Sequence, residues 1–237
     1  MDIQFLGTGD AFSHRANTSI LVDGKILLDC GLTTVQQLMK AKADLHRISL
    51  LSISHFHMDH AFGIPALLSV CKKEGRTRPL VIYGPTGAEQ YVKELLAVAH
   101  KKGLDVFGFE IKVYDAKNTK ADGYSLTFAP MRHALPCNAV SIEKDGKKVT
   151  YTGDGKPTEE AKKIMQGSDL LIAESYMQGF DHHHSIVDSA KLAKETKAKK
   201  LALIHISRKE DIGKELIEAK KIYSPITAPE DLTAIKI

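Results

Sequence analysis

The chain has 237 residues, of which 43% are hydrophobic and 26% are charged, with a formal net charge of +4 and a pI near 8.8. This composition is typical of a globular protein with enough apolar material for a core, and no run approaches the roughly 18 apolar residues of a membrane span. The charge allows a polyanionic substrate but does not indicate one, because the lysines are scattered and those from 191 to 200 are typical of a solvated helix face.

The cysteines indicate the redox compartment. There are three of them, Cys30, Cys71 and Cys137, an odd number without paired spacing, so a disulfide framework is not expected. The first residues lack the basic and apolar regions of a secretory signal. We therefore expect a cytoplasmic protein that does not associate with a membrane.

The first half of the chain is predicted to open with strands and then alternate strands with helices. The pattern indicates strands at 3–6, 19–22 and 25–29, a helix at 33–42, a strand at 48–53, a helix at 61–70, a strand at 80–83, a helix at 88–100 and a strand near 109–113. Asp23-Gly24 is a hairpin signal between two of these strands. Gly7 and Gly9 follow the first strand, where we expect them to supply backbone freedom rather than room for substrate.

The second half repeats this order of strands and helices after a polar stretch at 117–123. The pattern predicts strands at 125–128, 139–142 and 149–152, a helix at 159–165, a strand at 170–173, a helix at 186–196, a strand at 201–204, a helix at 212–220 and a short strand at 234–237. No linker composition separates the halves. We expect a single domain, 1–237, made of two similar halves of about 1–116 and 117–237, with two mixed sheets face to face and helices outside.

The strongest functional signal lies at residues 48–60. An apolar run of strand length leads into three histidines and an aspartate within six residues: His55, His57, Asp59 and His60. One histidine at a strand end is usually a hydrogen-bonded residue, but such clustering is improbable as an accident. Imidazole and carboxylate are the ligands that zinc and related metals prefer, so this stretch predicts a metal site.

Three further candidate ligands each follow a predicted strand: His133, Asp154 and His205. Strand ends hold side chains rigidly, which suits a ligand site. Taken alone, Asp154 reads as a plain turn residue and His205 as a hydrogen-bonded histidine. Their occurrence together with the cluster at 55–60 favours the metal interpretation.

Six motifs carry a resemblance to metallo-β-lactamase-fold hydrolases, most of all to the ribonuclease Z and phosphodiesterase branch. In chain order they are Phe5-Leu6-Gly7-Thr8-Gly9, Leu28-Asp29-Cys30-Gly31, His55-Phe56-His57-Met58-Asp59-His60, Tyr83-Gly84-Pro85, Tyr151-Thr152-Gly153-Asp154 and Ile204-His205-Ile206-Ser207. The resemblance covers nearly the whole chain. It implies a mixed α/β (α+β) fold, a four-layer αββα sandwich with a dinuclear site on one edge.

The resemblance also implies a ligand set, residue by residue. One of two divalent ions would be held by His55, His57 and His133, the other by Asp59, His60 and His205, with Asp154 bridging. Zinc is the expected metal, with manganese or iron as alternatives. Flavodiiron proteins of this fold carry a glutamate where this chain has His57, so a di-iron redox site is disfavoured.

The phosphodiesterase branch adds a histidine before the last strand, and residues 181–185, Asp-His-His-His-Ser, supply candidates. We align His184 with it, because Ser185 and a predicted helix follow. His184 would then protonate the leaving oxygen, while Asp59 binds metal and orients a metal-bridging hydroxide. Glu174 is a candidate to hold His184, although a surface carboxylate is an equal alternative. His182 and His183 would have no role or form a surface metal tract.

The resemblance departs from ribonuclease Z in one interval. Ribonuclease Z carries a long arm that grips tRNA between the ligands matching His133 and Asp154, whereas 21 residues (154 minus 133) separate them here. The missing arm puts tRNA processing in doubt, so we expect the phosphodiester substrate to be a small cyclic nucleotide or an RNA 3′ end. A lactonase or other ester hydrolase of this fold, and a non-catalytic metal-containing binding or sensor protein, are the alternatives. Related enzymes suggest a homodimer.

Overall fold

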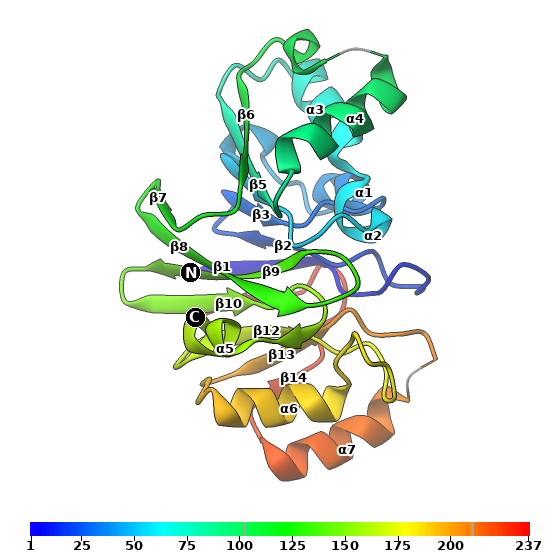
Figure 1. The fold of residues 1–237 in the computed structure, drawn as a ribbon, viewed down its shortest axis with the longest axis vertical. Helices are drawn as coiled ribbons and strands as arrows, with labels where there is room; N and C mark the ends of the chain where they lie inside the picture. The colour runs from blue at the N-terminus through cyan, green and yellow to red at the C-terminus, as the bar shows by residue number, and fades with distance from the viewer. Residues whose placement is uncertain (102, 210) are drawn as a thin grey trace.

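The computed structural model describes residues 1–101, 103–209 and 211–237. Two sheets pack face to face, and helices cover the outer face of each, so that the molecule has four layers (Figure 1). Chain termini lie side by side at the sheet interface, where the Met1 amino group donates to the Ile237 carbonyl at 3.0 Å. This is the predicted αββα sandwich.

The first sheet is built by the N-terminal half and the last strand. Its order is β15 (Ala234–Lys236), β1 (Asp2–Gly7), β2 (Ser19–Val22), β3 (Ile26–Leu28), β4 (Leu50–Ser52), β5 (Leu80–Gly84) and β6 (Ile111–Asp115). Pairing is antiparallel from β15 to β3 and parallel from β3 to β6. The pairing of β15 with β1 means that the division near residue 116 does not coincide with the division between sheets.

The second sheet has the same mixed plan. Its order is β11 (Lys156–Pro157), β8 (Tyr124–Arg132), β9 (Cys137–Lys144), β10 (Lys147–Tyr151), β12 (Leu170–Glu174), β13 (Leu201–Ile204) and β14 (Ile226–Thr227), and β7 (Thr119–Ala121) also pairs with β8. Pairing is antiparallel from β11 to β10 and parallel from β10 to β14. β8, β10, β12 and β13 therefore run in the same direction and end at the same edge.

Strand side chains alternate between two apolar environments. In β3, Ile26 and Leu28 belong to the core between the sheets, whereas Leu27 belongs to the core beneath the helices of the first sheet. Because successive side chains of a strand point to opposite faces, a strand in the middle of four layers is apolar throughout. This is why the short strands read as continuous apolar runs.

The helices divide between the two outer faces. The first sheet is covered by α1 (Thr34–Lys40), α2 (Met58–Ala61), α3 (Ile64–Lys73) and α4 (Ala88–His100), the second by α5 (Glu159–Met165), α6 (Ile186–Glu195) and α7 (Ile212–Ile222). Short 3-10 turns occur at Leu45–Arg47 and Leu104–Phe107. No helix in the described ranges is long and apolar enough to cross a membrane.

The structure differs from the sequence predictions at three kinds of position. The strands β7, β11 and β14 were not predicted; each has two or three residues and reads as loop by itself. The helix predicted at 61–70 divides into α2 and α3 at Gly63, whose Cβ position would lie 2.1 Å from the Gly31 carbonyl oxygen. Gly7 is also required for close packing, not for backbone freedom, because a Cβ there would lie 2.1 Å from the Asn17 carbonyl oxygen.

Candidate metal centre

Seven predicted ligands come together at one edge of the two sheets. They follow the ends of β4, β8, β10 and β13, or lie in α2 directly after β4: His55, His57, Asp59, His60, His133, Asp154 and His205. The ends of strands that run the same way meet at one edge, and ligand sites of mixed α/β sheets form there. The sequence spacing therefore becomes a cluster only when both sheets are in place.

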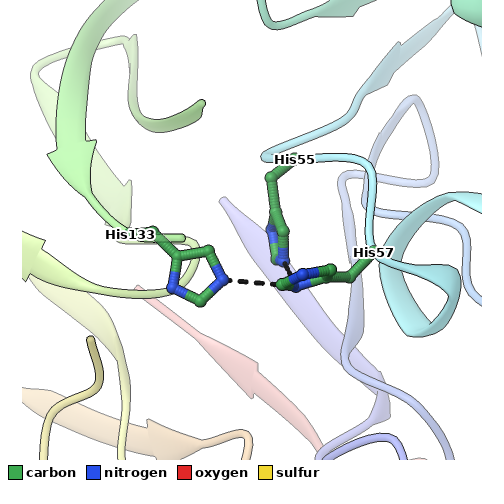
Figure 2. A group of neighbouring side chains, drawn as sticks. All are labelled: His55, His57 and His133. Atoms are coloured by element: carbon green, nitrogen blue, oxygen red, sulfur yellow. Dashed lines mark hydrogen bonds between the residues drawn. The ribbon is translucent and has the colours of Figure 1, made fainter. Parts of the chain in front are cut away.

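The first group contains His55, His57 and His133. His55 Nε2 lies 2.8 Å from His57 Nδ1, and His133 Nε2 lies 3.2 Å from the same atom. Figure 2 shows the three rings converging, two from the segment after β4 and one from the end of β8. Phe56, between the two neighbouring histidines, points the other way and stacks on Tyr91 with ring centroids 3.9 Å apart. This contact fixes the loop that presents His55 and His57.

The second group contains Asp59, His60 and His205. One ligand atom from each lies within 4.8 Å of the others. His60 Nε2 is 3.4 Å from Asp59 Oδ2. His205 has φ of +54°, a left-handed conformation that costs a non-glycine residue about 1–3 kcal/mol and is concentrated at functional sites.

Asp154 lies between the two groups. Its Oδ2 is 3.8 Å from His55 Nε2 and 3.2 Å from His205 Nε2, and its Oδ1 is 3.5 Å from His60 Nε2. One carboxylate thus faces a histidine of the first group and two of the second. This is the position that a bridging ligand would occupy.

Three buried polar atoms in this cluster have no hydrogen-bond partner within the described chain: His60 Nε2, Asp154 Oδ1 and His205 Nδ1. A buried polar atom without a partner costs about 1–3 kcal/mol. Such atoms converging from separate elements fit a bound cation, because imidazole nitrogen and carboxylate oxygen are ligands of divalent metals. The residues present therefore fit a metal pair.

The charges around His60 and Asp154 support this fit. Burial lowers the pKa of His60, but the carboxylates of Asp154 and Asp29 outweigh it, and the net pKa lies well above 6.5. Burial raises the pKa of Asp154, but His205, His60 and His55 outweigh it, and the net pKa lies well below 3.8. The site thus combines ionised carboxylates with a strong preference for positive charge at His60.

Asp29 supports the site from beneath, a role that the sequence analysis did not assign. The His60 Nδ1–H donates to Asp29 Oδ2 at 2.7 Å, which leaves Nε2 directed at Asp154 and Asp59. The Ser54 and Tyr151 hydroxyls donate to the same oxygen at 2.7 and 2.6 Å. A carboxylate behind a ligating histidine fixes its tautomer and orientation. The sequence signals were its place at the end of an apolar predicted strand and its occurrence in the motif Leu28-Asp29-Cys30-Gly31, neither of which indicates what it contacts.

The structure places His183 at the site and His184 away from it, which corrects the alignment made from sequence. His183 Nδ1 is hydrogen-bonded to Glu174 Oε1, and its ring packs 4.6 Å from that of Tyr176. His184 instead lines a separate cavity with Arg132, Lys156 and Lys162 among its neighbours. The segment before α6 is a turn and bend without a regular period, so an alignment based on the following Ser185 could not tell which of the adjacent histidines faces the site.

Glu174 is buried and does hold a histidine, but that histidine is His183. Its Oε2 accepts the Gly155 N–H at 2.6 Å and the His184 backbone N–H at 3.4 Å, while Oε1 accepts from the His183 ring. Burial and the nearby Asp154 raise the pKa of Glu174 well above 4.5. His182 contributes its backbone carbonyl, which lies 3.0 Å from His133 Nδ1.

A cavity of about 340 Å³ opens onto the cluster. It is lined by Asp10, Ala11, Phe12, His57, Met58, Asp59, Asp154, Tyr176, His183 and His205. A larger cavity of about 540 Å³ lies between the end of α1 and β15, but no histidine lines it, so volume alone does not locate the site. The smaller cavity is lined both by members of the ligand cluster and by apolar side chains, among them Phe12 and Met58.

The chain is similar in sequence to one family of known proteins over most of its length. The sequence profile of the anti-Pycsar protein Apyc1 family matches residues 1–221, which is most of the chain. The chain belongs to the anti-Pycsar protein Apyc1 family. All seven predicted ligands and His183 lie within the matched residues.

Relatives of this family member include ribonucleases Z. It is 28% identical to ribonuclease Z of Methanosarcina mazei over 298 residues, with 99% of this chain and 97% of the relative covered. The short form of human tRNase Z is 26% identical, with a TM-score of 0.82 and coverage of 100% of this chain and 99% of the other. The YhfI protein of Bacillus subtilis, a metallo-β-lactamase-fold protein, is 21% identical with a TM-score of 0.84, covering 99% and 98%, which shows a shared fold.

These likenesses confirm the predicted fold and branch. The chain has the metallo-β-lactamase fold and is a ribonuclease Z-like, metal-dependent hydrolase of the phosphodiesterase class. The alignment with the Methanosarcina mazei relative spans 298 positions against 237 residues, so at least 61 of its positions have no counterpart here. This chain is therefore shorter than that relative but shares its fold along almost the whole length.

Proposed function

We propose that this family member is a dinuclear-metal phosphodiesterase that cleaves small cyclic nucleotides. One observation carries the proposal: buried, unpartnered ligand atoms converge at a small cavity that also holds a carboxylate-supported histidine. Two ligand groups share Asp154, as a two-metal site requires. The proposed ligand sets are His55, His57 and His133 for one ion, and Asp59, His60 and His205 for the other.

The chain's own residues would each carry one part of the reaction. The two divalent ions that these residues would hold would supply charge neutralisation for the phosphodiester and a lowered pKa for a bound water. Asp59 lies at the cavity wall and would accept a hydrogen bond from that water, which fixes its direction of attack. Asp154 would hold the two ligand groups at a constant separation, because its two oxygens face different histidines.

His183 would supply the proton that the departing oxygen needs. The His183 Nδ1 is hydrogen-bonded to Glu174, so the proton on Nε2 would be the one transferred. Burial lowers the pKa of His183, which weakens its hold on that proton. General acid catalysis of this kind contributes about 10²- to 10⁴-fold in rate. Glu174 would act as a positioning residue.

The preference for a small substrate is supported by the segment between His133 and Asp154. It is filled by β9, β10 and their turn, Asp145-Gly146, and contains no projecting arm. A cavity of about 340 Å³ is also near the lower end of small-ligand sites. A cyclic nucleotide would need no binding contacts outside this cavity.

Cleavage at an RNA 3′ end is the second candidate. It is favoured by the ribonuclease Z relatives, which match the chain over almost its full length. A long RNA would need contacts beyond the cavity, and the missing alignment positions remove sequence that those relatives possess. We therefore rank it second.

The test begins with hydrolysis of bis(p-nitrophenyl) phosphate before and after chelation, with zinc or manganese restored. Metal-dependent turnover is expected. A 3′,5′-cyclic nucleotide and a precursor tRNA are then compared at equal enzyme concentration, and we expect a much higher kcat/KM for the cyclic nucleotide. Faster tRNA cleavage would reverse the ranking. Turnover of a lactone but of no phosphodiester, by protein shown to hold two ions, would overturn the proposal.

We also propose that the bound metal is zinc, that the protein is a homodimer and that it is located in the cytoplasm. The ligand set of histidine and carboxylate suits zinc, although it also accepts manganese or iron. The three cysteines are all free and buried, which suits a reducing compartment. Elemental analysis of protein purified without added metal, sedimentation equilibrium and cell fractionation test these points separately.

A further inference from the structure

Phe12 is a large exposed aromatic residue beside a buried polar cluster. Its side chain is 65% exposed, yet it lines the same cavity as His57, Asp59 and His205. The loop that carries it, between β1 and β2, projects at the same end of the sheets as the segment between β12 and α6 that carries His183 (Figure 1). Single exposed apolar residues are common and need no explanation, so exposure alone indicates nothing.

What distinguishes Phe12 is that its loop is braced at both ends. The Phe12 N–H donates to Asp10 Oδ1 at 2.9 Å, which closes a tight turn. Arg15 Nη1 donates to the Thr8 hydroxyl and to the Pro229 carbonyl at 3.0 and 2.9 Å. These bonds hold the backbone of the loop that carries Phe12, whose side chain lines the cavity. The exposed ring is therefore part of the cavity wall.

The loop is also joined to the metal centre. Asp231 accepts from the Thr8 and Ala16 backbone N–H groups at 2.9 and 2.6 Å, and Gly9 forms a bridge with Ile206, next to His205. The position of the Phe12 loop is thus coupled to the strand end that carries a proposed ligand.

Met58 adds to the apolar wall. It is 36% exposed at the first position of α2, directly before Asp59, and lines the cavity with Phe12 and Ala11. Methionine is flexible and polarisable and packs well against aromatic rings. The cavity is therefore lined by proposed metal ligands, which suit a phosphate, and also by an aromatic ring and a thioether.

We propose that Phe12, together with Met58, is the platform on which the nucleobase of the substrate stacks. This inference rests on the proposed phosphodiesterase function and names the part of the substrate that the ligand cluster cannot recognise. A phosphodiester anchored at the cluster places its remaining bulk in the rest of the cavity, and Phe12 is the flat apolar surface there. Base stacking on an aromatic ring depends on the π-face that every base has, so the platform accepts purines and pyrimidines.

The test compares two cyclic phosphates with the metal-loaded protein. One is a 3′,5′-cyclic nucleotide, and the other is the matching 1-O-methylribose 3′,5′-cyclic phosphate, which lacks the base. In Phe12→Ala, the KM of the nucleotide should rise by about 10- to 100-fold relative to that of the base-free compound, with the effect in KM rather than kcat. Phe12→Trp should restore the wild-type KM ratio.

A matched control removes an exposed apolar side chain outside the cavity. Val98 in α4 is 86% exposed, and Val98→Ala should leave both KM values unchanged. A Phe12→Ala protein with a wild-type KM ratio would overturn the platform while leaving the phosphodiesterase intact. Absence of turnover of either cyclic phosphate by the wild-type protein would instead overturn the proposed function, and the platform with it.

Discussion

The Nδ1–H of His60 donates to Oδ2 of Asp29 at 2.7 Å, with both residues fully buried. Two further donors, the hydroxyls of Ser54 and Tyr151, reach the same oxygen. One carboxylate oxygen thus links β3, the segment after β4 and β10. The cluster of proposed ligands rests on this oxygen through His60.

Asp29→Asn is expected to lower metal affinity by about 10- to 100-fold, because it removes the carboxylate behind His60, a proposed ligand. It should also lower the free energy of unfolding by about 3 kcal/mol. An amide NH₂ in place of Oδ2 could not accept the hydrogen bonds that Ser54, His60 and Tyr151 donate there. Competition with a chromophoric chelator and chemical denaturation measure the two effects. Asp169→Asn is the control, because Asp169 accepts from Lys148 and Lys199 away from the site. Equal metal affinity in both variants would show that Asp29 has no part in holding metal.

Gly31→Ala is expected to displace the helix that carries two proposed ligands. A Cβ at Gly31 would lie 1.9 Å from the carbonyl oxygen of Asp59, which is backbone and cannot rotate away. We expect about 1–3 kcal/mol of destabilisation and a loss of bound metal. Gly213→Ala in α7 is the matched control, because the nearest atom to its Cβ would be 3.5 Å away. Metal content measured after dialysis should fall only in the first variant.

His183→Ala and His184→Ala should differ in activity. His183→Ala is expected to lose about 10²- to 10⁴-fold in kcat, because the leaving oxygen loses its proton donor. His184→Ala should keep activity, because His184 lines another cavity. Kinetics with a phosphodiester bearing a poor leaving group, at matched metal content, measure the difference. Glu174→Gln should lower kcat and change the pH profile, as a positioning residue would. A larger loss of kcat in His184→Ala than in His183→Ala would instead support His184 as the proton donor, as it was aligned from the sequence.

His184 should make stability depend on pH. Burial lowers its pKa to about 4; Asp188 opposes this shift, and Lys156 and Arg132 add to it. Between about pH 6.5 and 4 the unfolded chain binds a proton at His184 that the folded protein does not, so stability rises with pH in this window. Acidification across it should cost the wild type up to about 3 kcal/mol more than His184→Gln. Denaturation curves of both proteins under the same metal conditions measure this gap, and parallel pH dependences would contradict it.

Local sequence information was sufficient for most elements of the fold. Helices α4 and α5 and strand β13 begin and end at the predicted residues, because each combines an apolar pattern with clear boundaries. β7, β11 and β14 carry too few residues for a period to be read. The pairing of β15 with β1 joins residues at opposite ends of the chain, and no local pattern encodes such a contact.

The sequence by itself determined the kind of chemistry to expect, because histidines and aspartates at 55–60 and after later strands are the residue types that suit metal ligation. Only the tertiary structure decided which side chains share that site. Asp29 joins it because β3 ends beside β4, a neighbour relation of the sheet. His183 joins it, and His184 does not, because the irregular segment before α6 has no period from which direction can be read. The type of ligand that a residue can offer follows from its side chain, whereas the direction in which that side chain points is set by tertiary packing.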